Sequence, residues 1–122
     1  GASSRPGAEV VPVDEEKQRI LPLIEAIVRR FPEAFVSVDT WRAAVARDAV
    51  AAGAHLVNDI SAGRLDTAEN MYETVASLQV PYILMHMAGT PETMQQNPEY
   101  TDVNTEVLDF FIREISRLHA AG

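Results

Sequence analysis

Three short apolar segments alternate with longer segments of helical periodicity, and this alternation constrains the fold more than any other feature. Residues 35–38, 55–58 and 82–86 are rich in residues that favour strands. The segments between them carry apolar residues at helical spacing. Strands that are joined through a helix run parallel, with right-handed crossovers. The sequence therefore predicts an α/β fold built of parallel βα units.

Capping residues and helix breakers mark the expected helix ends. Asp14 is a suitable N-cap for a first helix that stops before Pro32, and Thr40 suits the start of a helix over 41–52. We expect a third helix near 67–78 and a fourth, amphipathic helix from Val103 onward.

The expected sheet is too small to be complete. Three parallel strands bury little apolar surface and leave two exposed edges. The run Ser3-Ser4-Arg5-Pro6-Gly7 is a loop with no strand before it. We therefore expect residues 1–122 to form part of a larger parallel α/β domain that is incomplete at both ends. Neighbouring strands would come from segments outside this sequence or from another copy of the chain.

Charge and composition exclude several classes of function. The formal net charge is −8, from 18 acidic and 10 basic residues, which argues against a nucleic-acid or anionic-membrane surface. The absence of cysteine excludes disulfides and thiolate catalysis. No apolar run approaches the roughly 20 residues that span a bilayer. We expect a cytoplasmic protein that acts on small molecules, with no metal site among these residues.

The candidate functional residues follow the expected strands. Asp39 comes after the first strand, Asn58 ends the second and Asp59 follows it, and Met85 and His86 end the third. Active sites of parallel α/β folds lie at the carboxyl ends of the strands. A buried strand tolerates a polar tip only where that group has a partner. The pattern predicts one pocket to which all three strands contribute.

Each candidate also has a purely structural interpretation. Asp39 with Thr40 is equally suited to capping the following helix, and Asp59 to bonding local backbone in a turn. We favour a supporting role for His86. Methionines such as Met85 belong to a core more often than to a pocket wall.

The opening loop holds the most distinctive single side chain. The guanidinium of Arg5, braced by Pro6 and Gly7, suits a carboxylate or phosphate group, because its planar fork binds such anions through two hydrogen bonds. Ser3 and Ser4 add hydroxyl groups beside it. The alternative is an arginine that only contacts solvent.

Five motifs in the same order resemble dihydropteroate synthase, and the resemblance covers essentially the whole chain. They are Ser-Ser-Arg-Pro-Gly-Ala at 3–8, Ser-Val-Asp-Thr at 37–40 with Val45-Ala46, Gly-Ala-His at 53–55 leading into Val-Asn-Asp-Ile at 57–60, Leu-Met-His-Met at 84–87, and Gly-Thr-Pro at 89–91 with Thr-Met-Gln at 93–95. The resemblance implies a TIM (β/α)8 barrel. It also implies an enzyme of folate biosynthesis, the target of sulfonamides. The enzyme joins 6-hydroxymethyl-7,8-dihydropterin pyrophosphate to p-aminobenzoate, giving 7,8-dihydropteroate and pyrophosphate.

The resemblance also implies roles for individual residues. Asp39 and Asn58 would hydrogen-bond the pterin ring, and Asp39 would stabilise the cationic methylene that forms as pyrophosphate leaves. Ile60 and Met85 would line the pterin slot.

The opening loop would close over p-aminobenzoate. Ser4, Arg5 and Pro6 would form its contact segment, with Arg5 near the pyrophosphate. Ser4 stands where many members of the family have threonine, so contacts to p-aminobenzoate would differ slightly.

Other features of the family are expected outside this chain. The asparagine that binds Mg²⁺ belongs to the family's first strand, so Mg²⁺ is expected as the cofactor of the whole enzyme, with no ligand here. The whole enzyme is expected to be a homodimer, and the isolated chain to be inactive. Two alternatives stay open, namely a pterin-binding methyltransferase domain and a non-catalytic pterin-binding or structural subdomain.

Overall fold

The computed structural model describes residues 1–3, 5–87 and 102–122. Along the chain these residues form α1 (Val13–Arg30), β1 (Ser37–Asp39), α2 (Ala43–Ala51), β2 (Leu56–Asp59), α3 (Met71–Leu78), β3 (Tyr82–Leu84) and α4 (Val103–Ala121). The strands pair in the order β1-β2-β3, and both pairings are parallel. The α/β fold with parallel βα units that the sequence predicts is therefore confirmed.

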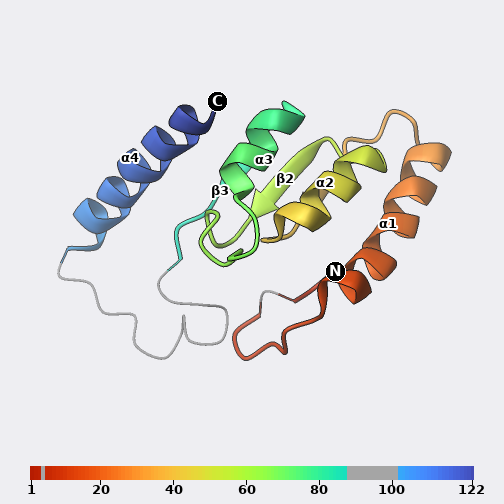
Figure 1. Cartoon of the computed structure of the whole chain (residues 1–122), viewed down its shortest axis with the longest axis horizontal. Coiled ribbons are helices and arrows are strands. Elements are labelled where there is room, and N and C mark those ends of the chain that lie inside the picture. Colours follow the sequence, from red (N-terminus) through yellow and green to blue (C-terminus); the bar gives the residue numbers. More distant parts are fainter. Residues whose placement is uncertain (4, 88–101) are drawn as a thin grey trace.

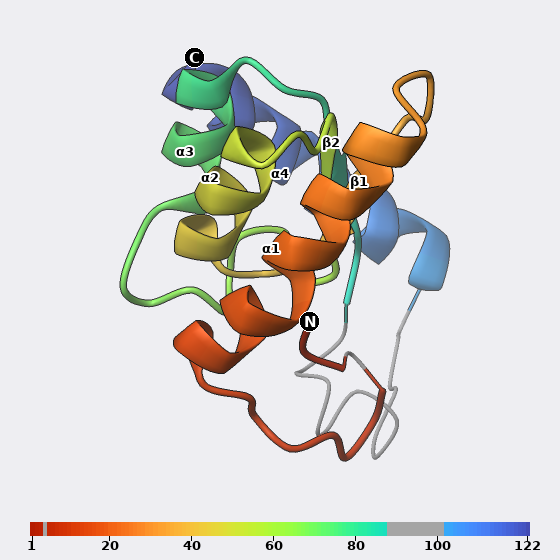
Figure 2. The ribbon, with the colours of Figure 1, turned by 90° about the vertical axis from the view of Figure 1, so that its right-hand side faces the viewer.

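The helices succeed one another across the molecule in the order α4, α3, α2, α1 (Figure 1). Viewed from the α1 side, α2 and α3 lie together on one side of β1 and β2 (Figure 2). Each helix contacts its neighbour in this row, from α1 to α4. One face of the sheet is thereby covered.

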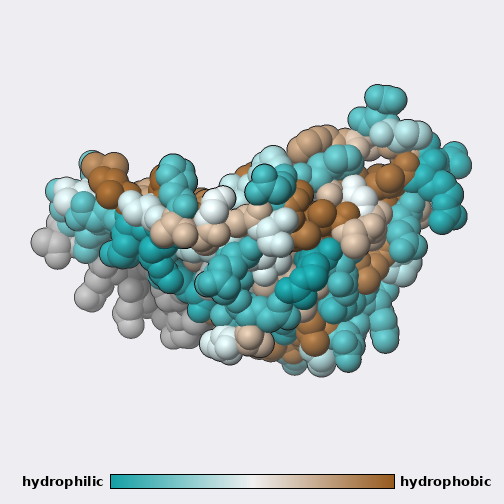
Figure 3. Space-filling view, turned by 45° about the horizontal axis from the view of Figure 1, so that its top comes forward, coloured by the Kyte–Doolittle hydropathy of each residue, from teal (hydrophilic) through white to brown (hydrophobic). Residues whose placement is uncertain are grey.

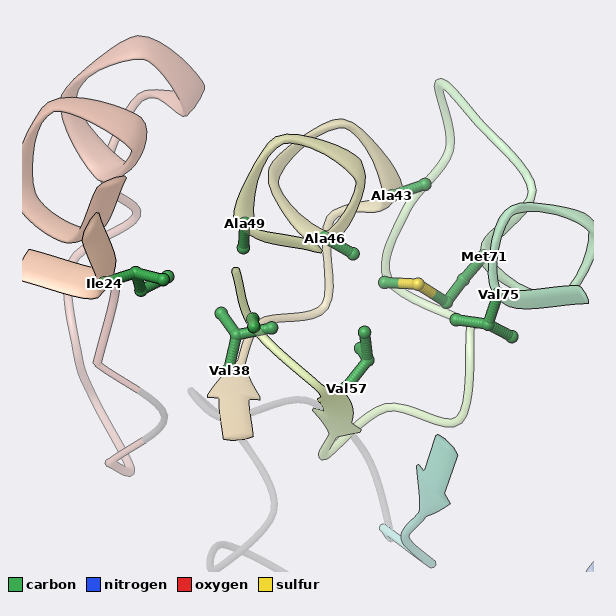
Figure 4. Close-up of a cluster of buried hydrophobic side chains, with 9 residues drawn as sticks. Ile24, Val38, Ala43, Ala46, Ala49, Val57, Met71 and Val75 are labelled. Atoms are coloured by element: carbon green, nitrogen blue, oxygen red, sulfur yellow. The ribbon is translucent and has the colours of Figure 1, made fainter. Parts of the chain in front are cut away.

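The core lies between that face and the helices. Val38 and Val57 point from the sheet toward α2 and α3 (Figure 4), and Val57 is completely buried. Three alanines of α2 face these valines, and the small side chains let the helix approach the sheet closely. Met71 and Val75 of α3 and Ile24 of α1 complete the cluster.

The opposite face of the sheet stays open among the described residues. Phe35 is 69% exposed, Ile83 46% and Met85 37%. The strands thus carry apolar residues on both faces, as in parallel sheets that are covered on both sides. In the described part of this chain the helices cover only one of the two faces of the sheet. Elsewhere, apolar patches are interspersed with hydrophilic surface (Figure 3).

Several predicted boundaries are wrong by a few residues, and side-chain contacts explain two of them. Asp14 makes no capping bond, because α1 already begins at Val13, with Pro12 in the cap position. Thr40 does not cap α2, because its hydroxyl accepts from the N–H of Arg42, which precedes the helix, and donates to Glu16 of α1 at 2.9 Å. The helix starts at Ala43, whose N–H donates to the Asp66 carboxylate at 2.7 Å.

The third helix begins later than the predicted residue 67. Asp66 accepts hydrogen bonds from the N–H groups of Ala68 and Glu69, which holds this stretch in a turn. Asn70 then caps α3, accepting from the N–H groups of Tyr72 and Glu73. The predicted start of α4 at Val103 is confirmed, with Asp102 as its cap.

The observed strands also differ slightly from the predicted segments. β1 covers 37–39 where 35–38 was expected, β2 covers 56–59 where 55–58 was expected, and β3 stops at Leu84 where 86 was expected. The parallel ladder selects these residues, since it pairs Ser37 with Leu56 and ends by pairing Asp59 with Leu84.

Candidate active site at the carboxyl ends of the strands

The register of the sheet brings Asp39 and Asn58 together. These residues are partners in the parallel ladder between β1 and β2, and the Asn58 side chain is near enough to lower the pKa of the Asp39 carboxyl group. Asp39 is exposed and Asn58 half-buried, so both are accessible from the open side of the sheet. The parallel register thus places two of the predicted site residues next to each other at one edge of the sheet.

The environment of Asp39 resists ionisation of its carboxyl group. Partial burial is the largest influence and raises its pKa above the ordinary value of 3.8. The neighbouring Asn58 side chain lowers the pKa, while the charges of Asp59 and Glu16 raise it further. Asp39 caps no helix, because the N-cap position of α2 belongs to Arg42. A carboxylate held in this way gains from a positively charged or hydrogen-bond-donating ligand.

Asp59 has a structural role, because its carboxylate stabilises the turn that follows β2. Its side chain is fully buried, and it accepts from the Ser61 N–H and hydroxyl, each at 2.8 Å. Its second oxygen accepts from the Gly63 N–H and the Tyr82 hydroxyl, each also at 2.8 Å. The turn interpretation of Asp59 is confirmed. These contacts hold the backbone that follows Asn58.

A second buried network of hydrogen bonds joins α3 to the loop between β2 and α3 and to α4. This network was not predicted from the sequence. The Tyr72 hydroxyl lies 2.8 Å from the Ala62 carbonyl and 2.9 Å from the buried Glu114 carboxylate. Arg113 and Arg117 pair with the same carboxylate at 3.2 and 3.0 Å. Glutamate on an apolar helix face was the available signal, since burial of that residue type requires partners.

The residues predicted to line a pterin slot lie near the same edge. Ile60 is half-buried, and Met85 is exposed on the open side of the sheet, outside the core. His86 is half-buried, edge-on to the Phe110 ring at 4.9 Å. Arg64 joins the adjoining loops, since its guanidinium donates to the Met87 carbonyl at 2.6 Å.

The opening loop is only partly described. Ser4 lies outside the described residues, whereas Arg5 and Pro6 are exposed. The Arg5 N–H donates to the Ser3 hydroxyl at 3.3 Å, and the Arg5 carbonyl accepts from the Ala8 N–H at 3.1 Å. The segment before α1 lies at the end of the molecule toward which β2 points (Figure 1). Within the described residues no hydrogen bond or ion pair joins the Arg5 guanidinium to Asp39.

Two further observations concern metal ions and membranes. Across residues 1–3, 5–87 and 102–122, no group of three or more His, Cys, Asp or Glu is arranged to bind a metal ion. None of the helices in this part of the chain is long and apolar enough to cross a membrane.

Comparison with known proteins assigns this geometry to a family. The sequence model of the pterin binding enzymes matches residues 1–122. The dihydropteroate synthase of Escherichia coli K12 is 46% identical over 122 residues, which are 100% of this chain and 42% of that protein. The chain thus spans about two fifths of the length of the Escherichia coli and Haemophilus influenzae synthases that it matches.

Solved structures agree in fold. A Yersinia pestis dihydropteroate synthase with a sulfonamide drug matches with a TM-score of 0.93 at 43% identity, over 100% of this chain and 43% of that one. A Burkholderia cenocepacia synthase with 7,8-dihydropteroate matches with a TM-score of 0.84 at 43% identity, over 100% and 42%. The three βα units therefore have the arrangement of part of the barrel of these enzymes. The chain belongs to the family of pterin binding enzymes and is similar over its full length to dihydropteroate synthases.

Proposed function

We propose that these residues supply the pterin-binding strand ends and the substrate-closing loop of a dihydropteroate synthase, a transferase of folate biosynthesis. The observation that carries the proposal is the pairing of Asp39 with Asn58 at an accessible sheet edge. The similarity to the Escherichia coli and Burkholderia cenocepacia synthases supplies the reaction class. In this proposal the chain forms part of one barrel domain.

The pair suits the chemistry of a pterin. The Asp39 carboxylate accepts hydrogen bonds from the amino and ring N–H groups, and the Asn58 amide both donates and accepts. Loss of pyrophosphate from the hydroxymethyl carbon creates positive charge that the ring shares. A carboxylate already in position stabilises this charge in the transition state more than in the ground state. Asp39 is therefore proposed as a catalytic residue as well as a binding residue.

The remaining predicted residues complete the proposed site. Ile60 and Met85 form apolar walls against the pterin faces. Ser4, Arg5 and Pro6 close over p-aminobenzoate, and the Arg5 guanidinium binds the departing pyrophosphate. Closure of such a loop excludes water from a reactive electrophile.

Among the described residues, no group of three or more His, Cys, Asp or Glu is arranged to hold a metal ion. Mg²⁺ belongs to the proposal only as the cofactor of the whole enzyme. For that enzyme we propose small-molecule substrates and a homodimeric assembly in the cytoplasm.

A chimera tests the proposal directly. The matching segment of the Escherichia coli synthase is replaced by residues 1–122, and pteroate formation is measured. We expect activity in the chimera, and a fall of at least about 100-fold in kcat/KM with Asp39→Asn, the size typical for loss of a preorganised charge. Glu15→Gln, an exposed change in α1, is the control and leaves the rate unchanged.

Two results would overturn the proposal. One is a folded chimera that makes no pteroate. The other is full activity in the Asp39→Asn variant. Methyl transfer from methyltetrahydrofolate without pteroate formation would support the methyltransferase alternative, and pterin binding with neither reaction would support a non-catalytic module.

A further inference from the structure

A buried carboxylate from α1 binds two side chains of the turn that directly follows Asp39. Glu16 is 1% exposed and lies in the first turn of that helix. One oxygen accepts from the Thr40 hydroxyl at 2.9 Å, and the other accepts from the Arg42 guanidinium at 2.7 Å. Thr40 directly follows Asp39 in the chain, so Glu16 lies one residue away from the proposed catalytic group.

Both the hydroxyl and the backbone N–H of Thr40 are hydrogen-bonded. Its single hydroxyl proton goes to Glu16, and its hydroxyl oxygen accepts from the Arg42 N–H at 3.2 Å. Its own N–H donates to the Asn58 carbonyl at 3.0 Å, which extends the ladder beyond β1. With a side chain only 3% exposed, Thr40 connects α1 to the backbone of both Asp39 and Asn58.

Arg42 is held as well. Its guanidinium lies 4.2 Å from the Trp41 ring centroid while it pairs with Glu16. The turn over residues 40–42 is therefore fixed by one carboxylate that originates 24 residues before Thr40.

We propose that Glu16 is a positioning residue for the pterin site: through the Thr40 hydroxyl it holds the Asp39 carboxylate beside the Asn58 amide. The inference rests on the proposed function where it concerns pterin affinity. Its geometric part, the coupling between Asp39 and Asn58, is independent of any ligand.

The competing interpretation is a buried ion pair that only stabilises the fold. Such pairs are weak determinants of stability when both partners are present. The hydrogen bond to Thr40 distinguishes the two, because the pairing of Glu16 with Arg42 uses the other carboxylate oxygen. Removing the Thr40 hydroxyl leaves the ion pair intact.

The electrostatic surroundings of Asp39 include groups from several elements. Glu16 of α1 and Asp59 of β2 raise its pKa, and the terminal amino group of Gly1 lowers it, while burial remains the largest influence. Arg42, from the turn before α2, neutralises part of the Glu16 charge. Removal of that charge therefore lowers the pKa of Asp39, whereas removal of the Thr40 hydroxyl acts on geometry.

The experiment uses the chimera described above, in which residues 1–122 replace the matching segment of the Escherichia coli synthase, and it has two readouts. In the first, the side-chain amide signals of Asn58 are followed by NMR while the Asp39 carboxyl is titrated. In the second, the affinity for 6-hydroxymethylpterin is measured by calorimetry. Thr40→Val is the main variant, Thr40→Ser is its conservative partner, and Glu15→Gln is the matched control for Glu16→Gln.

We expect Thr40→Val to reduce the Asn58 response to the Asp39 titration by more than half and to weaken pterin binding roughly tenfold, the size of one charge-assisted hydrogen bond. Thr40→Ser restores most of both. Glu16→Gln lowers the pKa of Asp39 and weakens binding, whereas Glu15→Gln changes neither.

An unchanged Asn58 response in a folded Thr40→Val chimera would overturn the positioning role. If Glu16→Gln unfolds, the comparison of Thr40→Val with Thr40→Ser still decides the question. Expected Asn58 responses in a chimera that binds no pterin would count against the proposed function while supporting the positioning role.

Discussion

Asp39 and Asn58 are ladder partners at the carboxyl ends of β1 and β2, and the Asn58 side chain acts to lower the pKa of Asp39. The pairing follows from parallel strands in register, since such strands bring their ends to one edge. This arrangement destabilises the ionised form of Asp39, whose carboxyl group is partly buried near two other acidic side chains. A site of this kind trades stability for binding.

Replacing Asp39 with asparagine should stabilise the chain. Because the folded-state pKa of Asp39 is raised, the folded chain keeps this proton to a higher pH than the unfolded chain. The group therefore costs stability as the pH rises from its ordinary value of 3.8 through the folded-state pKa. Since solvent screens an exposed group, we expect a gain below about 1 kcal/mol for Asp39→Asn near neutral pH. Urea unfolding at several pH values measures it.

The gain should shrink as the pH falls below the folded-state pKa of Asp39, where both chains carry a neutral group. A stabilisation that is constant across the acid range, or a loss of stability near neutral pH, would contradict the electrostatic account.

Alkaline conditions should destabilise the chain through two buried tyrosines. Burial is the main cause that raises the pKa of Tyr72 and of Tyr82 above the ordinary value of 10.0, with hydrogen bonds to Glu114 and Asp59 adding to it. A raised pKa means that each hydroxyl contributes stability below pH 10.0, and this is lost as the pH rises further. Above the pKa of the unfolded chain and below that of the folded chain, each tyrosine lowers the free energy of unfolding by about 1.4 kcal/mol per pH unit.

Tyr82→Phe tests this slope. We expect the variant to lose about 1 to 2 kcal/mol near neutral pH, because Asp59 loses one of its buried donors, and to show a shallower alkaline decline. Urea unfolding between about pH 8 and pH 11 spans the titration of a free tyrosine. An alkaline decline equal to that of the parent chain would rule out Tyr82 as its source.

Gly53 should tolerate alanine far less well than Gly7. Both glycines have positive φ, 117° for Gly53 and 73° for Gly7. An added Cβ at Gly53 would lie 2.8 Å from a Val28 methyl, whereas at Gly7 nothing lies within 4 Å. We expect a loss of about 1 kcal/mol for Gly7→Ala and about 3 kcal/mol for Gly53→Ala, because the second change adds a steric clash to the backbone strain.

Thermal unfolding of the two variants provides the comparison, and Gly7→Ala serves as the control for backbone strain alone. Similar losses in both would show that α1 shifts freely away from the end of α2.

Asp66 should be the strongest single determinant of where α2 begins. Its carboxylate accepts from the Ala43 N–H at 2.7 Å and from two N–H groups of its own turn. We expect Asp66→Ala to cost about 2 kcal/mol and Asp66→Asn about half as much, since the amide keeps one acceptor oxygen. Amide hydrogen exchange at Ala43 reports the loss locally, and unchanged protection there would contradict the assignment.

Local patterns predict the elements well and their ends less well. The start of α4 was predictable because its cap, Asp102, is adjacent in sequence. The start of α2 was not, because its first N–H is satisfied by Asp66, which lies 23 residues later in the chain. Thr40, the cap that the sequence suggests, has its hydroxyl hydrogen-bonded to Glu16 of α1. Sequence propensities reflect interactions between neighbours along the chain. Asp66 and Glu16, in contrast, lie far from the start of α2 in the sequence.

The sequence by itself determined the alternation of strands and helices, and with it the parallel sheet and the edge where Asp39 and Asn58 meet. It did so because periodicity and chain connectivity are local properties. Tertiary structure alone decided which buried groups support that edge. Glu16 reaches Thr40 across 24 residues, and Tyr72 reaches Glu114 across 42. Such contacts depend on the packing of whole helices, since a buried polar group accepts whichever partner the packing supplies.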